Sequence, residues 1–339
     1  MSVAVQLLTW NGEAFLGECL DSLSRQTYKD WQIFILDNNS EDQTSAIISH
    51  WFVHHRGHWQ KNSQNVGFAR GHNLLLKSHE WPYVFILNQD VILEPSYLDK
   101  LMSCFIARSR VGSATGCLLR LERDNERLTK TDTMDSAGLK IYRTHRVVER
   151  GRGEAAWPVG ADEEIFGVPA TAALYRRSAL NEAAAKTSNG LEWFDENFGS
   201  YKEDVDLAYR LQLFGWRSVY VSAARGYHYR GLRGAVDADT ALFGVATWRS
   251  RRERSATANR QSYRNHLLFI FKSFAFPPFS PVWWQTVFYE TMKLFILIFT
   301  EPKTLMAWTD VYKLRGALAV KRRSILAISR GPENIARFF

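Results

Sequence analysis

Three acidic side chains, Glu203, Asp204 and Asp206, open a helical stretch in the second half of the chain. Acids in the first turn of a helix stabilise its N-terminus, and this ordinary role explains one or two of the three. Asp204 also shares a stripe with the apolar residues Leu207 and Leu211, which places its carboxylate on the inward side of the helix. An inward carboxylate beside a pocket is a candidate general base.

Polar residues also follow three apolar runs, 3–8, 31–36 and 83–87, which have the length and composition of buried strands. The residues that follow the three runs are Thr9 and Asn11, then Asp37 and Asn39, then Asn88 and Asp90. One such cluster is an ordinary turn, but three at the carboxyl edge of one parallel sheet outline a polar pocket suited to a nucleotide. Asn88 and Asp90 carry oxygen atoms that can hold Mg²⁺ or Mn²⁺ against a diphosphate, although this pair alone is a weak motif.

Stretches with helical spacing alternate with these strands, at 13–25, at 44–52 and from the loop at 65–71 through Leu76. Because each strand is an apolar run without alternation, the sequence predicts an α/β fold with a mostly parallel sheet covered by helices on both faces. Further strands are predicted at 166–175 and 216–221, a helix at 203–214, and a mobile loop at the polar stretch 122–132.

The positive charge lies in the C-terminal third of the chain. The formal net charge of +8 divides into +12 from Arg225 to Phe339 and −4 over the preceding residues. The sequence therefore predicts a catalytic domain at 1–240 and a basic, aromatic-rich helical region at 241–339. Lys and Arg beside bulky aromatic residues on amphipathic helices suit the headgroup region of an anionic bilayer. The alternatives are a helical appendage packed on the catalytic domain and a homodimer interface. The basic residues concerned are Arg249, Arg251, Arg252, Arg254, Arg260, Arg264, Lys272, Lys321, Arg322 and Arg323, and the aromatic ones are Trp283, Trp284, Phe288, Phe295 and Phe299.

The cysteine count and the hydropathy exclude several classes of protein. Three cysteines without CxxC spacing provide neither a disulfide framework nor a zinc site, and they favour a reducing compartment. The N-terminus lacks the pattern of a signal peptide, and no run of apolar residues is long enough for a transmembrane helix. We therefore expect a cytoplasmic protein, peripheral on the inner face of the plasma membrane.

The motifs, taken together, resemble the family 2 glycosyltransferases with the GT-A fold, a Rossmann-like sheet sandwiched by helices. Within that family the sequence most resembles the bacterial rhamnosyltransferase-like branch, over roughly residues 1–230. The motifs in order are Asp37-Asn38-Asn39-Ser40, Asn65-x-Gly67-Phe68-Ala69-Arg70-Gly71-x-Asn73, Leu87-Asn88-Gln89-Asp90, Phe194-Asp195-Glu196-x-Phe198, Glu203-Asp204-Val205-Asp206-Leu207, Gly215-Trp216-Arg217 and Tyr227-His228. Each motif alone is weak, and the ordered series is specific.

The resemblance implies roles for individual residues. Asp37 would bind a pyrimidine base, with Thr9, Asn11 and Asn39 nearby on the nucleotide. Asn65, Gly67 and Arg70 would line the loop that contacts the sugar nucleotide. Asn88 and Asp90 stand where the family has an Asp-x-Asp-type motif, with Asp90 and His228 as metal ligands. Asp204 matches the family's catalytic base, and Glu203 beside it is assigned to the acceptor. Trp193, just before the helix that carries Asp204, is either a residue that stacks on the acceptor sugar or a core aromatic. The family's frequent Asn-Pro-Asp reads Asn-Gln-Asp here, and Asn at its first position makes the ligand set less anionic.

The implied reaction transfers a sugar from a dTDP- or UDP-linked donor to an acceptor hydroxyl, with inversion, one base and a divalent cation, Mg²⁺ or Mn²⁺. The expected donor is dTDP-rhamnose and the expected acceptor a lipid-linked or growing surface glycan. Another donor sugar, such as galactofuranose or a hexosamine, and an inactive glycan-binding scaffold are the alternatives. The segment 261–265 is similar to the Gln-x-x-Arg-Trp motif of processive synthases but lacks its Trp, which favours non-processive transfer. No nucleic-acid-binding motif accompanies the basic region, so we expect no nucleic-acid partner.

Overall fold

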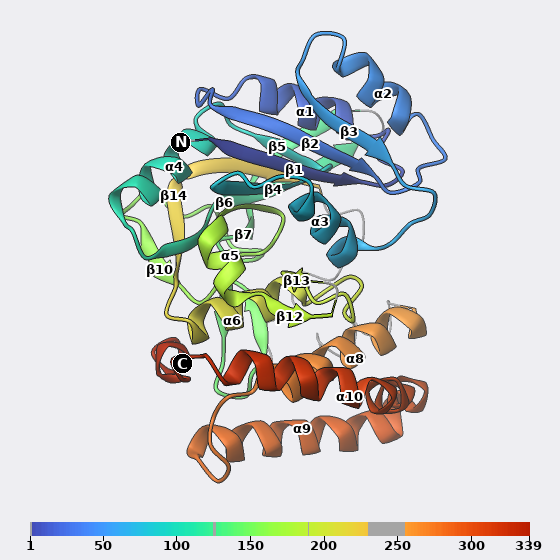
Figure 1. Ribbon diagram of the computed structural model, residues 1–339, viewed down its shortest axis with the longest axis vertical. Coiled ribbons are helices and arrows are strands. Elements are labelled where there is room, and N and C mark those ends of the chain that lie inside the picture. The colour runs from blue at the N-terminus through green and yellow to red at the C-terminus, as the bar shows by residue number, and fades with distance from the viewer. Residues whose placement is uncertain (1, 125–126, 189, 230–254) are drawn as a thin grey trace.

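The computed structural model describes residues 2–124, 127–188, 190–229 and 255–339. One large mixed sheet crosses the molecule in the order β10-β14-β6-β11-β4-β1-β2-β3, with β5 added to β14 and β7 added to β6 (Figure 1). The strands of this sheet are β1 (Val3–Thr9), β2 (Trp31–Asp37), β3 (Gly57–Lys61), β4 (Tyr83–Asn88), β5 (Val91–Leu93), β6 (Val111–Asp124), β7 (Arg127–Ser136), β10 (Glu163–Ile165), β11 (Ala172–Arg176) and β14 (Arg217–His228). Two small antiparallel pairs join β8 (Leu139–Ile141) to β9 (Val147–Glu149) and β12 (Ala185–Thr187) to β13 (Gly190–Glu192).

The strands that carry the polar clusters run parallel, as predicted. β1 lies between β2 and β4 in parallel register, with Thr9 opposite Asp37 and Leu8 opposite Asn88. β11 is antiparallel to both of its neighbours, β4 and β6, and β14 runs parallel to β6. The carboxyl ends of β1, β2 and β4 therefore meet at one edge of the sheet, where a doubly covered α/β sheet binds its ligands.

Helices cover both faces of the sheet (Figure 1). α1 (Leu16–Ser24), α2 (Thr44–Trp51) and α4 (Tyr97–Ala107) bury their apolar residues in the core on one face. α3 (Phe68–Lys77), α5 (Arg177–Ala183) and α6 (Glu203–Leu213) cover the other face. The predicted fold class, a mostly parallel α/β sheet sandwiched by helices, is confirmed.

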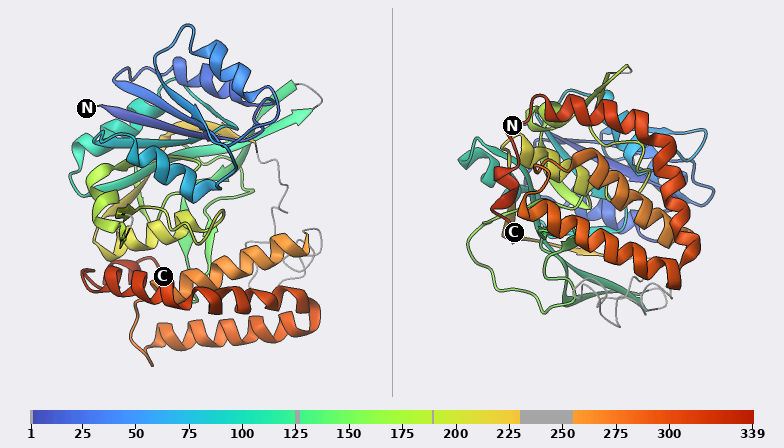
Figure 2. Two further views of the ribbon diagram at one scale, coloured as in Figure 1. Left: turned by 45° about the vertical axis from the view of Figure 1, so that its right-hand side comes forward. Right: turned by 90° about the horizontal axis from the view of Figure 1, so that it is seen from below.

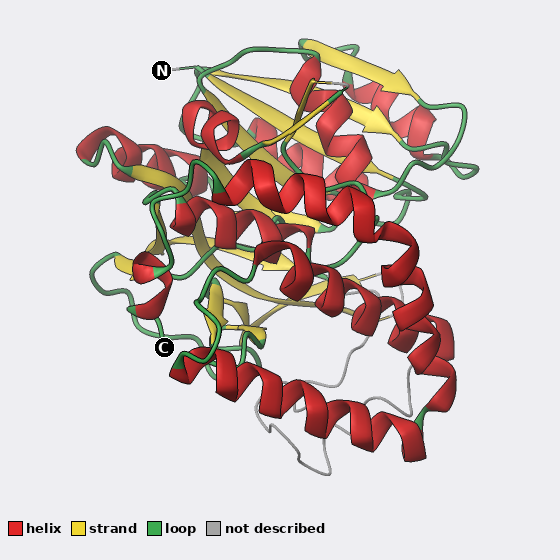
Figure 3. Ribbon diagram, turned by 60° about the horizontal axis from the view of Figure 1, so that its bottom comes forward, coloured by secondary structure: helices red, strands yellow, loops and turns green. Residues whose placement is uncertain are grey.

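The C-terminal segment is helical and gathers on one side of the strands (Figures 2 and 3). It consists of α8 (Ala256–Ser273), α9 (Pro281–Thr300), the 3₁₀ turn η2 (Pro302–Met306), α10 (Ala307–Leu326) and α11 (Glu333–Ala336). Apolar residues of α8 and α10, such as Leu268 and Leu318, belong to the same hydrophobic cluster as Leu207 of α6. The C-terminal helices and the α6 side of the sheet thus share one core. The boundary predicted at residue 240 lies outside the described residues.

Two sequence predictions of local structure are wrong. The run predicted as a strand at 166–175 forms a strand only from Ala172, where β11 begins. Gly167 and Pro169 interrupt its first half, and a proline has no N–H to donate to a neighbouring strand. The predicted mobile loop at 122–132 falls mostly on the β6–β7 hairpin, in which Glu122 pairs with Thr129. This hairpin is polar because it faces solvent. The basic helical region predicted at 241–339 lies partly outside the described residues, and its first described helix, α8, begins at Ala256 behind the N-cap Ser255.

Candidate functional site

Side-chain hydrogen bonds tie the loops after β1 and β2 together. The backbone N–H of Asn11 donates to Ser40 Oγ at 2.9 Å, and Asn11 Oδ1 accepts from the backbone N–H of Glu41 at 3.0 Å. Asn11 and Asn39 both adopt left-handed backbone conformations, with φ of 47° and 68°. Asn tolerates this conformation better than most residues, which explains its presence at both loop corners. Two of the predicted nucleotide residues therefore shape adjoining loops.

Gln89 joins the loop after β4 to the loop after β1. Its Oε1 accepts from Thr9 Oγ1 at 2.5 Å and from the backbone N–H of Trp10 at 2.9 Å, and its Nε2 donates to the Trp10 carbonyl at 3.2 Å. Gln89 occupies the middle position of the Asn-Pro-Asp pattern named in the sequence analysis. The replacement of proline there was the only sequence signal that pointed to a role for Gln89. Sequence reasoning noted the departure and missed its role, because the partner lies 80 residues away.

The Asp37 carboxylate lies inside the loop that follows β2. Its carboxylate is fully buried and accepts from the backbone N–H of Ser40 at 2.8 Å and from Ser45 Oγ at 2.5 Å. Lys61 Nζ lies 3.9 Å away. Asp37 therefore holds the shape of the loop after β2, and its contact with a pyrimidine base stays a prediction.

The predicted donor loop at 65–71 lies against the β2 loop. Asn38 Nδ2 donates to Asn65 Oδ1 at 2.8 Å, and the same oxygen accepts from the backbone N–H of Gly67 at 2.9 Å. Gly67 begins α3 with φ of 79°, a conformation that favours glycine. Arg70 is exposed on α3 and has no hydrogen-bond or ion-pair partner among the described residues, so its guanidinium is available to an anionic ligand.

Asp90 and His228 lie together, as the metal assignment requires. His228 Nε2 is 3.4 Å from Asp90 Oδ1, and His228 Nδ1 is 2.8 Å from Asp135 Oδ2 on β7. Burial lowers the pKa of His228, but the Asp90 and Asp135 carboxylates outweigh it and raise the pKa to about 10. Asp90 remains partly exposed, whereas Asp135 is buried. The ring is thus fixed with one nitrogen toward Asp90.

No three His, Cys, Asp or Glu side chains converge as a ready-made metal group within the parts of the chain that the structure describes. Asp90 and His228 fit a divalent cation as two ligands, provided that the imidazolium releases its proton when the cation binds and that diphosphate oxygens and water supply the rest. When bound, such a cation would neutralise charge on the leaving diphosphate. The two side chains thus suit a cation site completed by the substrate better than one made of protein ligands alone.

Asp204 stands at the start of α6 beside the loop before β11. Its Oδ1 accepts from the backbone N–H of Val205 at 2.7 Å, and its Oδ2 accepts from the backbone N–H of Ala170 at 3.4 Å. Burial and the nearby Glu149 carboxylate raise the pKa of Asp204 to about 6, against these two hydrogen bonds. The carbonyl of Thr171 accepts from the backbone N–H of Asn88 at 2.8 Å. The candidate base therefore lies at the same sheet edge as the β4 loop.

Glu203 and Trp193, the two residues assigned to the acceptor, are both buried. Glu203 is buried, one of its carboxylate oxygens has no hydrogen-bond partner, and burial beside Asp204 holds its pKa well above the usual range. Trp193 is buried in the core, where its ring N–H donates to Asn181 Oδ1 at 2.8 Å. Both side chains therefore lie in the interior beside α6 and not at the accessible edge of the sheet.

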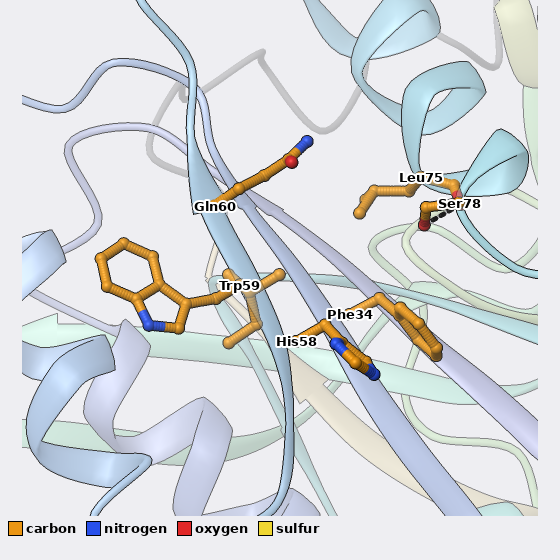
Figure 4. Close-up of a pocket in the computed structure, with 7 residues that line it drawn as sticks. Phe34, His58, Trp59, Gln60, Leu75 and Ser78 are labelled. Carbon is orange, nitrogen blue, oxygen red and sulfur yellow. Dashed lines mark hydrogen bonds between the residues drawn. The ribbon is translucent and has the colours of Figure 1, made fainter.

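A shallow cavity of about 270 Å³ lies elsewhere, between the edge strand β3, β2 and the end of α3 (Figure 4). His58 and Gln60 belong to one side of β3, and Trp59 projects to the other (Figure 4). None of the predicted site residues lines this cavity.

Comparison with known proteins agrees with the geometry. Residues 5–183, more than half of the chain, match the family model described as Glycosyl transferase family 2. The chain belongs to this family. Family 2 is an inverting glycosyltransferase family, so the chain is an inverting glycosyltransferase with the GT-A fold.

Individual relatives of this family 2 enzyme come from several bacteria. An N-acetylglucosaminyl-diphospho-decaprenol L-rhamnosyltransferase of Mycobacterium tuberculosis is 26% identical over 67% of this chain and 75% of its own length. The O-antigen biosynthesis protein RfbC of Myxococcus xanthus is 27% identical over 65% of this chain and 16% of its own length. Among solved structures, GalNAc-T7 with UDP, GalNAc and Mn²⁺ has a TM-score of 0.57 at 11% identity, covering 89% of this chain and 58% of that one. At this identity the likeness concerns the fold.

Asp90→Ala is expected to weaken Mn²⁺ binding in the presence of nucleoside diphosphate by at least about tenfold, because it removes an oxygen ligand. Free Mn²⁺ measured by electron paramagnetic resonance provides a readout that is independent of transfer. Asp132→Asn, which alters an exposed acid on β7, is the matched control. Equal Mn²⁺ affinity in the Asp90 variant and the parent would contradict the metal assignment.

Proposed function

We propose that the enzyme transfers a deoxyhexose, with rhamnose from dTDP-rhamnose as the first candidate, to a lipid-linked or growing cell-surface glycan. The observation that carries the transferase proposal is Asp204, a partly exposed carboxylate with a pKa raised to about 6 at the edge where the donor loops meet. The named activity of the mycobacterial relative and the O-antigen role of the Myxococcus relative support the choice of sugar and pathway.

In the proposed reaction each residue acts through a group at this edge. The Asp204 carboxylate accepts the proton of the acceptor hydroxyl while that oxygen attacks the anomeric carbon and the bond to the diphosphate breaks. Asn65 and Gly67 shape the donor loop, and the Arg70 guanidinium contacts the diphosphate. Asp90 and His228 hold the divalent cation. A single displacement requires one base and no second carboxylate.

The competing proposals differ in the donor and in catalysis. A hexosamine donor is favoured by another relative, the poly-beta-1,6-N-acetyl-D-glucosamine synthase of Staphylococcus epidermidis, which is 22% identical over 64% of this chain and 47% of its own length. A galactofuranose donor would use the same machinery. An inactive scaffold is disfavoured because Asp204 and the Asp90–His228 pair are both in place.

Calorimetric titration with a panel of dTDP- and UDP-sugars, each with Mg²⁺ and with Mn²⁺, tests the donor proposal. The expected result is tightest binding of dTDP-rhamnose, followed by its hydrolysis or transfer. Tighter binding of a UDP-hexosamine would replace rhamnose by that donor. Binding of no nucleotide sugar in the presence of metal would remove the transferase proposal itself.

We also propose that α9 meets the anionic surface of the membrane that carries the acceptor. Trp284, Phe288, Phe295 and Phe299 are each more than half exposed on this helix, which is the outermost one in Figure 1. The exposed cations Lys303, Lys313, Arg315 and Arg323 follow on η2 and α10. The acids of the same segment are less exposed, with Asp310 bound to Arg260 and Glu290 bound to His266. This combination of an aromatic face and free positive charge suits the interface of an anionic bilayer.

The structure revises which basic residues belong to that surface. Lys272 and Lys321 are buried in ion pairs with acids of the catalytic part, and Arg260 pairs with Asp310. Arg264 donates to the carbonyl of Asn197. Lys272, Lys321 and Arg264 thus bind the C-terminal helices to the rest of the chain, as in the alternative of a packed appendage, whereas the Arg260–Asp310 pair joins α8 to α10. The predicted Arg249, Arg251, Arg252 and Arg254 lie outside the described residues. Every helix within the described ranges is too short or too polar to span a bilayer.

Replacement of both Phe288 and Phe295 by Ser is expected to reduce sedimentation with vesicles of phosphatidylcholine and phosphatidylglycerol by at least about tenfold, because two large apolar groups are lost. Ile106→Ser, on the exposed side of α4, is the matched control. Vesicles of phosphatidylcholine alone should retain less protein. Unchanged sedimentation of the double variant, or loss of a dimer in light scattering instead, would assign the α9 face to another partner.

A further inference from the structure

We propose that α8 positions the candidate base, through a clamp made by the side chains of Asn265, Arg264 and Gln261 on the loop that precedes Asp204. This inference rests on the proposed function, in which Asp204 is the base. It assigns to the C-terminal helices a part in transfer itself, separate from any contact with a membrane.

The clamped loop, residues 197–202, has a strained backbone that local hydrogen bonds, such as that from the N–H of Ser200 to the carbonyl of Phe198, hold only in part. Gly199, Tyr201 and Lys202 have φ of 69°, 74° and 70°. Two successive left-handed residues other than glycine are unfavourable, and such conformations persist where the surroundings impose them. Lys202 is also the N-cap of α6, and no side chain caps the helix there. The position of Asp204, two residues later, therefore depends on what holds this loop.

Asn265 is fully buried and aims its amide at the loop. Its Nδ2 lies 3.0 Å from the carbonyl oxygen of Phe198 and 2.8 Å from those of Ser200 and Tyr201. Its Oδ1 accepts from Arg264 Nη1 at 2.9 Å. A single side chain thus gathers three carbonyls of the strained segment, and its own oxygen is satisfied by a neighbour on the same helix.

Arg264 extends the clamp to the start of the loop, and Gln261 adds a second contact at its middle. Arg264 Nη2 donates to the carbonyl of Asn197 at 2.7 Å, and Gln261 Nε2 donates to that of Ser200 at 3.3 Å. The two residues that match the Gln-x-x-Arg motif of synthases, Gln261 and Arg264, therefore both bind this loop in the structure. Their polar side chains face protein backbone in this geometry.

The loop also touches the proposed donor loop on its other side. The backbone N–H of Ala69 donates to the carbonyl of Gly199 at 3.2 Å, and a Cβ added to Gly67 would lie 3.4 Å from the same oxygen. The 197–202 segment therefore lies between α8 and the residues assigned to the sugar nucleotide, and it ends at the base. Asn265, Arg264 and Gln261 are positioning residues because they act on Asp204 through this backbone.

The test compares Asn265→Ala with Gln212→Ala, each in the parent and in the Asp204→Asn background. Gln212 is a matched control, since it is a fully buried amide on α6 that donates to the carbonyl of Phe166 at 2.8 Å, far along the helix from the base. Initial rates at varied concentrations of a donor found in the panel, with the acceptor saturating, give kcat and the donor KM, and circular dichroism reports folding and Tm.

We expect Asn265→Ala to lower kcat by at least about tenfold, to change the donor KM by less than about twofold and to move the acidic limb of the pH profile away from 6. In the Asp204→Asn background the same change should cause no further loss, because there is no base left to position. Asn265→Asp, which keeps the shape and loses the two N–H donors, should behave like the alanine variant.

Two results would overturn the clamp. One is an equal kcat loss in the Asn265 and Gln212 variants that follows their Tm. The other is that Asn265→Ala lowers kcat by the same factor in the Asp204→Asn background as in the parent, which would mean that the two residues act independently. If Asp204→Asn itself retains full activity, the base assignment fails. If Asp204→Asn is inactive and Asn265→Ala is fully active, the clamp alone fails.

Discussion

Asp204→Asn is expected to lower kcat by between about a hundredfold and about ten-thousandfold, because the acceptor hydroxyl loses the group that takes its proton. Donor affinity measured by calorimetry should remain within about twofold of the parent, since the carboxylate acts on the acceptor. Glu203→Gln is the matched control, because burial already favours the protonated form of Glu203 and the change preserves its shape. An Asp204→Asn variant with parental kcat would remove the assigned base.

The same carboxylate sets the expected pH dependence of transfer. A base is active only when ionised, and burial with Glu149 nearby raises the pKa of Asp204 to about 6. kcat should therefore fall as pH decreases through about 6, tenfold for each unit well below that value. Single-turnover rates across pH 4.5 to 8, at roughly half-unit steps, follow this limb. A limb near 4, the ordinary value for a carboxyl, would show that the site leaves Asp204 unperturbed.

Lys272→Met should destabilise the protein by about 3–5 kcal/mol, the second large effect that we expect. Lys272 Nζ lies 2.7 Å from Asp195 Oδ2 and 2.7 Å from Asp206 Oδ1, and all three side chains are buried. Removal of the cation leaves two buried carboxylates with less compensation, although Lys321 still lies 2.6 Å from Asp195 and Arg210 2.9 Å from Asp206. Urea unfolding at neutral pH, with the slope compared between variants, measures the loss.

Lys313→Met provides the control for this measurement, since Lys313 is exposed on α10 and its loss should change stability by less than about 0.5 kcal/mol. The pH dependence gives a second check. Burial raises the pKa of Asp195, but Lys272 and Lys321 outweigh it and hold the pKa well below its usual range. The corresponding stability is present above the unfolded pKa near 4 and is lost as pH falls below it. A destabilisation of less than about 1 kcal/mol in Lys272→Met would contradict the proposed energetic role.

The parallel strands and their polar ends were predictable because each depends on local signals. An apolar run of five to seven residues followed by Thr, Asn or Asp predicts a buried strand and a turn. The parallel pairing of β1, β2 and β4 then brings these turns to one edge. The assignment of Asp90 and His228 as a pair came instead from the resemblance to family 2, and the two side chains lie 3.4 Å apart.

Other predictions failed because residue type does not determine burial or a distant partner. The burial of Asp37 and Glu203 was not foreseen when they were assigned to ligands, and those two assignments stay predictions. Lys272 was counted toward a membrane surface, but its two acidic partners lie more than 60 residues earlier in the chain. Nothing local distinguishes such a lysine from one that faces solvent. The 122–132 hairpin was missed because solvent exposure of both strands removes the apolar alternation that marks a strand.

The core shared by α6, α8 and α10 limits which C-terminal helices could replace those of this enzyme in a chimera. A chimera that joins residues 1–229 to the helical segment of another glycosyltransferase must present cations opposite Asp195 and Asp206 and an amide opposite the carbonyls of 198–201. A graft chosen only for its apolar face would bury two carboxylates without partners and leave the turn before Asp204 unsupported. The helical segment therefore cannot be exchanged as an independent unit in this architecture, because its buried side chains also hold Asp195, Asp206 and the loop that precedes Asp204.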